Sequence, residues 1–576
     1  MQPPRRLAEV VERLTGRRDG RGALVLELDL THGFVEDVAH DPLARAMSRR
    51  RPVLRDAVER LHRAAGDPGV RGLVAKIGPW RHGLAWAQEV RDAVRVFQDS
   101  GKPAVAWAES FGELGPATVP YYLASGFDEI WLQESGDVGL TGVAAEVTFL
   151  RGALDKAGVQ PQFGQRHEYK NAANVLTERG FTEAHREAVT RVVESAAAQV
   201  VADVAAAREL TEAQVRMLVD RAPLTAAEAL AAGLVDRVGY RDEAYHAVRE
   251  RTRSGADGAA TPSLRYVSRY SKAGRRELAR RLRERGKPVV ALIHGTGAIK
   301  VGRSGRGPLT GPAMGADTVG AAFRSAVRSD AVKAIVFRVD SPGGSYVASD
   351  TIRREVELAS HAGKPVVVSM GTLAASGGYF VSMAADVIVA QPGTLTGSIG
   401  VLAGKGVVRD LVAKLGLTHD EVAAGEHALM FSARREFTDD QWDRLQSWLD
   451  RVYDDFTAKV AAHRSLSPEH VHEVARGRVW TGADAAERGL VDELGGLADA
   501  ARLARKKAGL PADAPLRPWP HVPPLQRLRP ATSSEDPRAA APSAWSLGWG
   551  SYAGLAAALG LPVAGPLTLP YSIALR

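Results

Sequence analysis

Two long stretches of this 576-residue chain resemble each other, and this internal repeat constrains the fold more than any other feature. Val70–Ile77 (VRGLVAKI) matches Val332–Val339 (VKAIVFRV), and Gly101–Pro103 matches Gly363–Pro365. Further matches follow in the same order: Leu140–Gly142 with Leu395–Gly397, Phe181–Thr182 with Phe437–Thr438, Leu224–Thr225 with Trp480–Thr481, and Gly233–Asp236 with Gly489–Asp492. An offset of about 260 residues is far too long for a solenoid and indicates a duplicated domain.

Each copy alternates short apolar runs with helical patterns. In the second copy the predicted strands are Pro288–His294, Ala334–Val339, Pro365–Met370 and Val387–Ala390, and a helical pattern covers Val347–His361. Such alternation is typical of βαβ units and a mainly parallel sheet. Thr438 and Gln441 form a capping box that predicts the start of a long amphipathic helix. We therefore expect an α/β fold of two tandem domains with helices flanking mainly parallel sheets.

The repeat and the composition divide the chain into five parts. We expect an N-terminal extension over 1–22, a first domain over 23–250, a basic linker over 251–287, a second domain over 288–508 and a Pro/Ala-rich tail over 509–576. The linker contains an Arg-rich helix candidate over 271–287. In the tail, residues 539–575 carry no charge and are broken by prolines, so we expect this stretch to pack on the protein or to be disordered.

Composition excludes several kinds of chemistry. The chain has no cysteine, which rules out disulfides, thiolate catalysis and zinc–sulfur sites. A net charge of +8 permits contact with an anionic membrane surface without requiring it. The N-terminal residues lack a continuous apolar core, because Glu9 and Glu12 interrupt it. We expect a cytoplasmic protein, or one held peripherally at the inner face of a membrane, with no cofactor, no metal and no nucleic-acid partner.

Ser376 lies in a run of small residues, TLAASGG over 372–378. A strand pattern, Lys364–Met370, leads into this run, and a helix pattern, Tyr379–Asp386, leaves it. Glycines permit a tight turn and close approach of substrate, and a helix start favours developing negative charge. The turn therefore suits a nucleophilic serine. The alternative interpretation is an ordinary helix N-cap.

The two copies differ at the positions where catalysis would occur. Where the second copy has Ser376, the first reads ESFG over 109–112. The first copy has Lys170, in HEYKN over 167–171, where the second reads GEHAL over 425–429. A serine needs a base to become a nucleophile, and a lysine can act as that base when burial lowers its pKa. Lys170 alone would be interpreted as a surface lysine, and it is its pairing with Ser376 that makes it a candidate base.

Two further elements belong to the second copy. Pro342-Gly343-Gly344 leaves a strand and enters a helix, so its N–H groups could stabilise an oxyanion, although a plain type II turn is an equal alternative. Ser398, in TLTGSIG over 394–400, could hold the lysine in place or could be a structural turn residue.

Together these segments resemble the signal peptide peptidase A family in its long, duplicated-domain form. The resemblance covers roughly residues 23–508 and is densest in RVDSPGGS, GKPVVVSMGTLAASGGYF, TLTGSIGV and VWTGADAAERGLVDELGG. It implies tandem Clp/crotonase-like domains and a Ser/Lys dyad with Ser376 as nucleophile, Lys170 as general base and Ser398 orienting the lysine. It also implies an oxyanion hole at Gly343 and Gly377, hydrophobic peptides such as cleaved signal peptides as substrates, and a homotetramer.

Other functions remain open from the residues alone. A crotonase-type acyl-CoA enzyme or binder would use the same glycine-rich oxyanion geometry without needing Ser376. A Clp-type Ser-His-Asp triad would want a histidine soon after the serine, and the first one is His419. A non-catalytic scaffold would not need the serine and the lysine that the two copies retain.

Overall fold

A computed structural model describes residues 23–36, 52–80, 82–113, 115–253, 261–270, 287–307, 311–520, 533 and 567–568. The predicted extension over 1–22, all but Lys287 of the helix candidate over 271–287, and most of the predicted tail lie outside these residues. Among the helices that the structure describes, none is long and apolar enough to cross a bilayer.

The first copy folds around a six-stranded parallel sheet with the order β8-β4-β3-β2-β1-β9. Its strands are β1 (Leu24–Asp29), β2 (Val70–Lys76), β3 (Ala104–Ala108), β4 (Glu129–Leu132), β8 (Arg237–Val238) and β9 (Ser263–Tyr266). One face packs against α3 (Leu54–Ala65), α4 (Leu84–Gln98), α5 (Thr118–Ala124), α8 (Glu183–Arg208), α9 (Glu212–Arg221) and α10 (Ala226–Ala231), and the other against α11 (Arg241–Arg251).

The second copy repeats this plan with the equivalent order β21-β17-β16-β14-β10-β22. Its strands are β10 (Val289–Thr296), β14 (Val332–Ser341), β16 (Val366–Ala375), β17 (Val387–Ala390), β21 (Glu493–Leu494) and β22 (Leu516–Pro518). One face packs against α13 (Ala316–Arg328), α14 (Tyr346–His361), α15 (Gly377–Ser382), α17 (Asp439–Arg464) and α18 (Pro468–Val474), and the other against α20 (Leu497–Lys507).

Shorter elements complete the chain. In the first copy they are β5 (Asp137–Val138), α6 (Arg151–Ala157), β6 (Gln160–Arg166), η1 (Asn171–Ala173), α7 (Asn174–Thr177), β7 (Leu224–Thr225) and η2 (Val267–Arg269). In the second they are β11 (Ala298–Lys300), β12 (Gly305–Gly307), β13 (Gly311–Gly315), β15 (Gly343–Gly344), β18 (Leu395–Gly397), β19 (Val401–Val407), α16 (Arg409–Lys414), β20 (Val479–Thr481) and α19 (Gly482–Glu487), and β23 (Leu567–Thr568) follows near the C-terminus.

The chain is therefore an α/β protein of two tandem copies with mainly parallel sheets, as the sequence predicts. The predicted second-copy strands form, and β14 and β16 run beyond their predicted ends. The Thr438–Gln441 capping box is present at the start of α17. The helix after Ser376 begins at Gly377 and ends at Ser382, earlier at both ends than the predicted Tyr379–Asp386, because the chain turns into it directly at the serine.

Each sheet gains an edge strand from a segment that the sequence analysis placed outside the domains. Within the predicted 251–287 linker, β9 pairs with β1. Within the predicted 509–576 tail, β22 pairs with β10 in the same parallel sense. Short polar segments that pair at a sheet edge leave only a weak pattern in the sequence. Composition therefore predicts a linker over 251–287 and a tail over 509–576 instead of edge strands.

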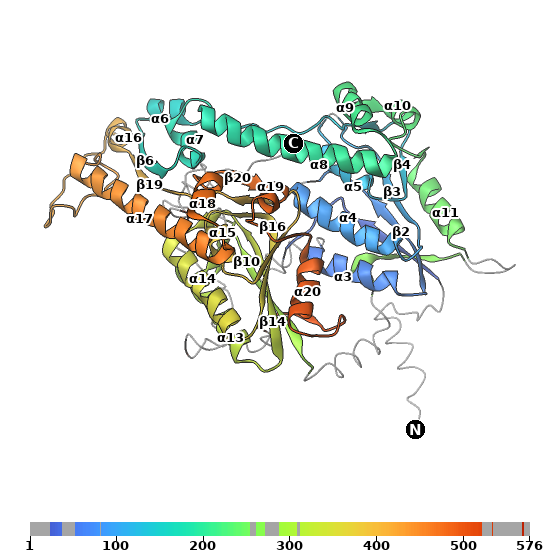
Figure 1. The fold of residues 1–576 in the computed structure, drawn as a ribbon. Coiled ribbons are helices and arrows are strands. Elements are labelled where there is room, and N and C mark those ends of the chain that lie inside the picture. Colours follow the sequence, from blue (N-terminus) through green and yellow to red (C-terminus); the bar gives the residue numbers. More distant parts are fainter. Residues whose placement is uncertain are drawn as a thin grey trace, which may run out of the picture.

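The two copies are joined by strand pairing as well as by the chain. β6 of the first copy and β19 of the second form an antiparallel ladder that runs from Arg166 opposite Val401 to Gln160 opposite Val407 (Figure 1). The long helix α8 of the first copy also contacts β20 of the second, where Ser195 Oγ and Thr481 Oγ1 lie 2.8 Å apart (Figure 1). These contacts bring the end of β6 to the edge of the second sheet.

Candidate active site

Ser376 stands at a strained turn at the carboxyl end of β16. Its backbone has φ 56° and ψ −113°, a region that non-glycine residues rarely occupy. The residue is buried, and its hydroxyl makes no hydrogen bond to the N–H groups of α15, the helix that it precedes. Ser376 therefore stands at the N-cap position of α15 without capping the helix through its side chain, which points instead to a partner from the other copy.

That partner is Lys170. Its Nζ donates to Ser376 Oγ at 2.8 Å, to Ser398 Oγ at 2.9 Å and to the Ser398 carbonyl at 3.0 Å. The lysine side chain is only 1% exposed. Burial away from water disfavours the charged form and lowers the pKa of Lys170 to about 7. At neutral pH a large share of these amines is therefore neutral and able to accept a proton.

The backbone at the end of β6 sets the position of Lys170. The lysine directly precedes η1, and its N–H donates to the His167 carbonyl at 3.0 Å. Gly477 lies against it with φ 91°, and a Cβ at Gly477 would lie 2.3 Å from Lys170 N. A Cβ at Gly400 would likewise lie 2.6 Å from the Arg166 carbonyl oxygen. Two glycines of the second copy thus leave space for the lysine segment of the first.

Sequence reasoning did not identify Gly477. The residue stands in Arg476-Gly477-Arg478 before β20, and nothing local distinguishes it from an ordinary turn glycine. A comparison of the copies offers a signal, since the first copy carries Arg221 at the same offset before Leu224–Thr225. At this position of the first copy no lysine approaches, and the long side chain of Arg221 is therefore tolerated.

Ser398 shares the strained geometry of Ser376. Its φ is 52°, and its N–H donates to the Arg478 carbonyl at 2.6 Å. This backbone conformation turns both the hydroxyl and the carbonyl of Ser398 toward Lys170 Nζ. Ser398 is thus both a turn residue and a lysine contact.

The glycine pair after β14 abuts the serine turn. Gly343 has φ 97°, a value that the third position of a type II turn also takes, so the turn and the oxyanion role of this pair both stay predictions. A Cβ at Gly377 would lie 3.0 Å from both Gly343 Cα and Gly344 N, so the two segments pack backbone to backbone. The N–H of Gly343 donates to Ser341 Oγ at 3.1 Å in this structure.

A buried ionic cluster lies beneath the turn and crosses between the copies. Arg338 donates to Glu36 at 2.6 Å and to Glu89, on α4, at 2.8 Å. Asp340 follows on the same strand and accepts from Leu373 N at 3.1 Å, and burial raises its pKa to about 6. The cluster thus ties the ends of β14 and β16 to the first copy.

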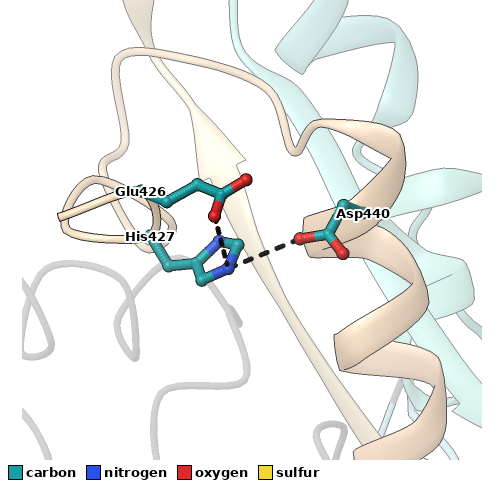
Figure 2. Close-up of side chains that lie close together, drawn as sticks. All are labelled: Glu426, His427 and Asp440. Carbon is teal, nitrogen blue, oxygen red and sulfur yellow. Dashed lines mark ion pairs between the residues drawn. The ribbon is translucent and has the colours of Figure 1, made fainter.

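The second copy has no lysine in the segment that matches Lys170. Glu426 and His427 stand there, and Figure 2 shows Asp440 of α17 beside them, with His427 Nε2 3.5 Å from an Asp440 carboxylate oxygen and 4.0 Å from a Glu426 one. His419, the first histidine after the serine, is 4.0 Å from Glu421. Ser376 Oγ bonds Lys170, and the geometry therefore gives a Ser-His-Asp triad at His419 no support.

A duplicated α/β fold, with Ser376 at the carboxyl end of a parallel strand and a buried lysine amine 2.8 Å from its hydroxyl, is the arrangement expected of a serine hydrolase. A family model described as peptidase family S49 matches residues 96–254 and 359–511, one segment in each copy. The chain belongs to this family and is a serine peptidase.

Individual proteins agree with the family assignment. The chain is 31% identical over 481 residues to the chloroplastic serine protease SPPA of Arabidopsis thaliana, which covers 83% of this chain and 68% of that protein. It is 32% identical over 467 residues to protease 4 of Salmonella typhi, over 79% of this chain and 72% of that protein. These matches to peptidases do not favour the acyl-CoA alternative.

Two solved structures are similar to parts of this chain. A mutant of ClpP1 from Listeria monocytogenes is 16% identical with a TM-score of 0.23, over 39% of this chain and 98% of that one. A protein attributed to the enoyl-CoA hydratase/isomerase family from Hyphomonas neptunium is 18% identical with a TM-score of 0.21, over 34% of this chain and 64% of that one.

Proposed function

We propose that the chain is an endopeptidase that cleaves hydrophobic peptides, cleaved signal peptides among them, through an acyl-enzyme on Ser376 with Lys170 as general base. The observation that carries the proposal is the 2.8 Å contact between Lys170 Nζ and Ser376 Oγ in a buried site. The choice of substrate rests on the resemblance of the second-copy motifs to the signal peptide peptidase A family.

Neutral Lys170 removes the proton from Ser376 Oγ as this oxygen attacks the scissile carbonyl carbon. The tetrahedral intermediate collapses, the C–N bond breaks and the lysine returns the proton to the leaving amine. Lys170 then removes a proton from water as the water oxygen attacks the ester carbonyl carbon. The C–Oγ bond breaks, Lys170 returns the proton to Ser376 Oγ, and the acid product leaves. Ser398 holds Nζ in line with Oγ through its hydroxyl and carbonyl contacts.

The developing oxyanion is stabilised by the N–H groups of Gly343 and Gly377. Gly377 opens α15, whose first N–H groups have no partner within the helix. Gly343 N–H would exchange its contact with Ser341 Oγ for the substrate oxygen. One such donor is worth about 2.7–4 kcal/mol of barrier.

The test is substitution of each dyad member with a matched control. Ser376→Ala and Lys170→Ala should abolish turnover of casein and of a hydrophobic peptide ester while the circular dichroism spectrum persists. Lys405→Met is the control, because Lys405 is the largely buried lysine of β19 and donates to the Met430 carbonyl at 2.7 Å, away from Ser376. Full activity in Lys170→Ala would show that Lys170 is not the general base. A serine-directed fluorophosphonate should label the unaltered chain and spare Ser376→Ala.

We also propose that four chains assemble head to tail. The β6–β19 ladder joins the copies within one chain, and the duplication leaves the matching segments, 146–152 of the first copy and 416–422 of the second, without such a ladder. Leu415, Leu417 and Val422 at this end of the second copy are exposed. A repeated head-to-tail contact closes into a ring. Light scattering should give a tetramer, and Val422→Glu should reduce it to smaller species.

The domain limits and the location of the protein complete the proposal. We place the two domains at 23–250 and 288–508, each extended by the edge strand described above. The basic net charge supports peripheral contact with an anionic bilayer surface from the cytoplasmic side. Flotation with vesicles that contain phosphatidylglycerol, but not with neutral vesicles, would bear this out.

A further inference from the structure

A segment close to the C-terminus forms a strand beside the serine turn. β23 pairs with β15 in antiparallel register, with Leu567 opposite Gly344 and Thr568 opposite Gly343. These strands belong to a small sheet with the order β12-β13-β11-β15-β23, in which β23 is an edge. The partner of this segment is thus the glycine pair that contains Gly343, which the proposed function places in the oxyanion hole.

The position of β23 relates it to both halves of the site. β15 packs against Gly377, the residue after Ser376, since a Cβ at Gly377 would lie 3.0 Å from Gly343 Cα. β23 also contacts β19, the strand whose partner β6 leads to Lys170. The segment therefore lies between the strand that adjoins the serine and the strand that pairs with the lysine segment.

An extended peptide would bind a protease of this kind at the same edge. Adding a strand to an open sheet edge gives affinity through main-chain hydrogen bonds, and glycines at the edge leave no side chain in the way. β15 consists of two glycines, and its other neighbour, β11, is already paired. β23 thus occupies the hydrogen-bonding edge that a substrate would need.

The chemistry of the segment matches that of a substrate. Leu567 and Thr568 belong to the uncharged stretch over 539–575, and prolines at 566 and 570 flank them. Because the segment is part of the same chain, its effective concentration at the groove does not depend on protein concentration. An apolar peptide from solution must compete with it.

We propose that β23, close to the C-terminus, is a pseudo-substrate that occupies the peptide groove of its own chain and must leave before substrate binds. This inference rests on the proposed function, because it takes the edge of β15 to be the substrate site. It makes the tail a built-in competitive inhibitor of the peptidase.

The test uses the Ser376→Ala chain, which cannot cleave its own tail. The probe is a fluorescein-labelled synthetic peptide of residues 563–572 (VAGPLTLPYS). A chain that ends at Gly560 should bind it at least about threefold more tightly than the full-length chain, because removal of the occupant raises the fraction of open grooves. Leu567→Pro in the full-length chain should also tighten binding, since proline removes a ladder N–H.

Ala558→Pro is the matched control, because it introduces a proline outside β23, and it should leave the affinity for the labelled peptide unchanged. Equal affinity of the shortened and full-length chains, or absence of binding to both, would overturn the inference. Labelling of the catalytically intact chain by the fluorophosphonate separates the two proposals. If labelling and turnover succeed while the affinities are equal, the tail proposal alone fails, and if they fail, the proposed function itself is wrong.

Discussion

The two copies share one sheet plan, yet they differ at the carboxyl ends of the central strands. β3 of the first copy has 5 residues, whereas its counterpart β16 has 10 and ends at the residue before Ser376. β2 has 7 residues and its counterpart β14 has 10, ending just before the Pro342-Gly343 turn. The extra length in the second copy carries the strands into the turns that would bind and attack a peptide, at the sheet end where α/β enzymes place their ligands.

The first copy fills the corresponding space with aromatic side chains. Phe111, at the place of the serine turn, is buried and packs edge-on against Tyr121. His82 stacks on Trp86 with ring centroids 4.4 Å apart and contacts Trp80 at 5.3 Å, at the place of the glycine pair. The first copy lacks the serine turn but keeps the segment that carries Lys170. Duplication thus allowed each copy to lose the half of the site that the other retains.

The largest effect on kcat should come from replacing Ser376, with Ser110, the serine at the matching turn of the first copy, as the control. Ser376→Ala should lower kcat by at least about 10⁴-fold, because the nucleophile is lost. Ser110→Ala in the first copy should leave kcat unchanged, because Ser110 Oγ bonds the backbone of Asp137, accepting from its N–H at 3.2 Å and donating to its carbonyl at 3.3 Å, and not a base. Steady-state kinetics on a peptide ester measures both. An equal loss in Ser110→Ala would show that the first copy also carries catalytic groups.

Next in size is the glycine that admits the lysine. Gly477→Ala should lower kcat by about 10²-fold, because the new Cβ displaces the Lys170 backbone and a misplacement of about 1 Å can cost that much. Gly233→Ala is the control, since Gly233 also has a left-handed φ, 75°, but no atom within 4 Å of an added Cβ. If both variants lose activity equally, backbone strain rather than the lysine contact is the cause.

A smaller loss is expected at Ser398. Ser398→Ala removes one of the three contacts of Lys170 Nζ and leaves the carbonyl contact, so kcat should fall by about tenfold, in line with the loss of one hydrogen bond to a charged or polar group. Val143→Ser places a hydroxyl at the matching position of the first copy and should change nothing. A change in KM rather than in kcat for Ser398→Ala would contradict the orienting role.

The smallest effect should be on stability. Lys170 binds a proton in the unfolded chain up to about pH 10.5 but in the folded chain only up to about pH 7, so the stability of the unaltered protein rises with pH over this window. Lys170→Met lacks this titration. Its melting temperature should exceed that of the unaltered protein at pH 7, and the gap should narrow toward pH 10. A difference in melting temperature between the two proteins that does not change with pH would mean that Lys170 is charged in the folded chain.

Much of the fold could be predicted because it follows local patterns. Buried parallel strands show continuous apolar runs, such as β17 and residues 334–337 within β14, and the capping box at Thr438 marks a helix start within four residues. The edge strands β9 and β22 could not be predicted, because their pairing depends on a neighbour far away in the chain. The same holds for Gly477 and for the strand at Leu567–Thr568.

The sequence by itself determined which residues could take part in the site, because comparing two copies of one domain shows what each has kept and lost. It singled out Ser376, Ser398 and the glycine pair in one copy and Lys170 in the other. Only the tertiary structure decided that these residues meet, since the β6–β19 ladder and the gap left by Gly477 bring Nζ to 2.8 Å from Oγ. The pKa of Lys170 near 7 also belongs to the tertiary structure, because removal from water depends on atoms that segments far apart in the chain contribute together.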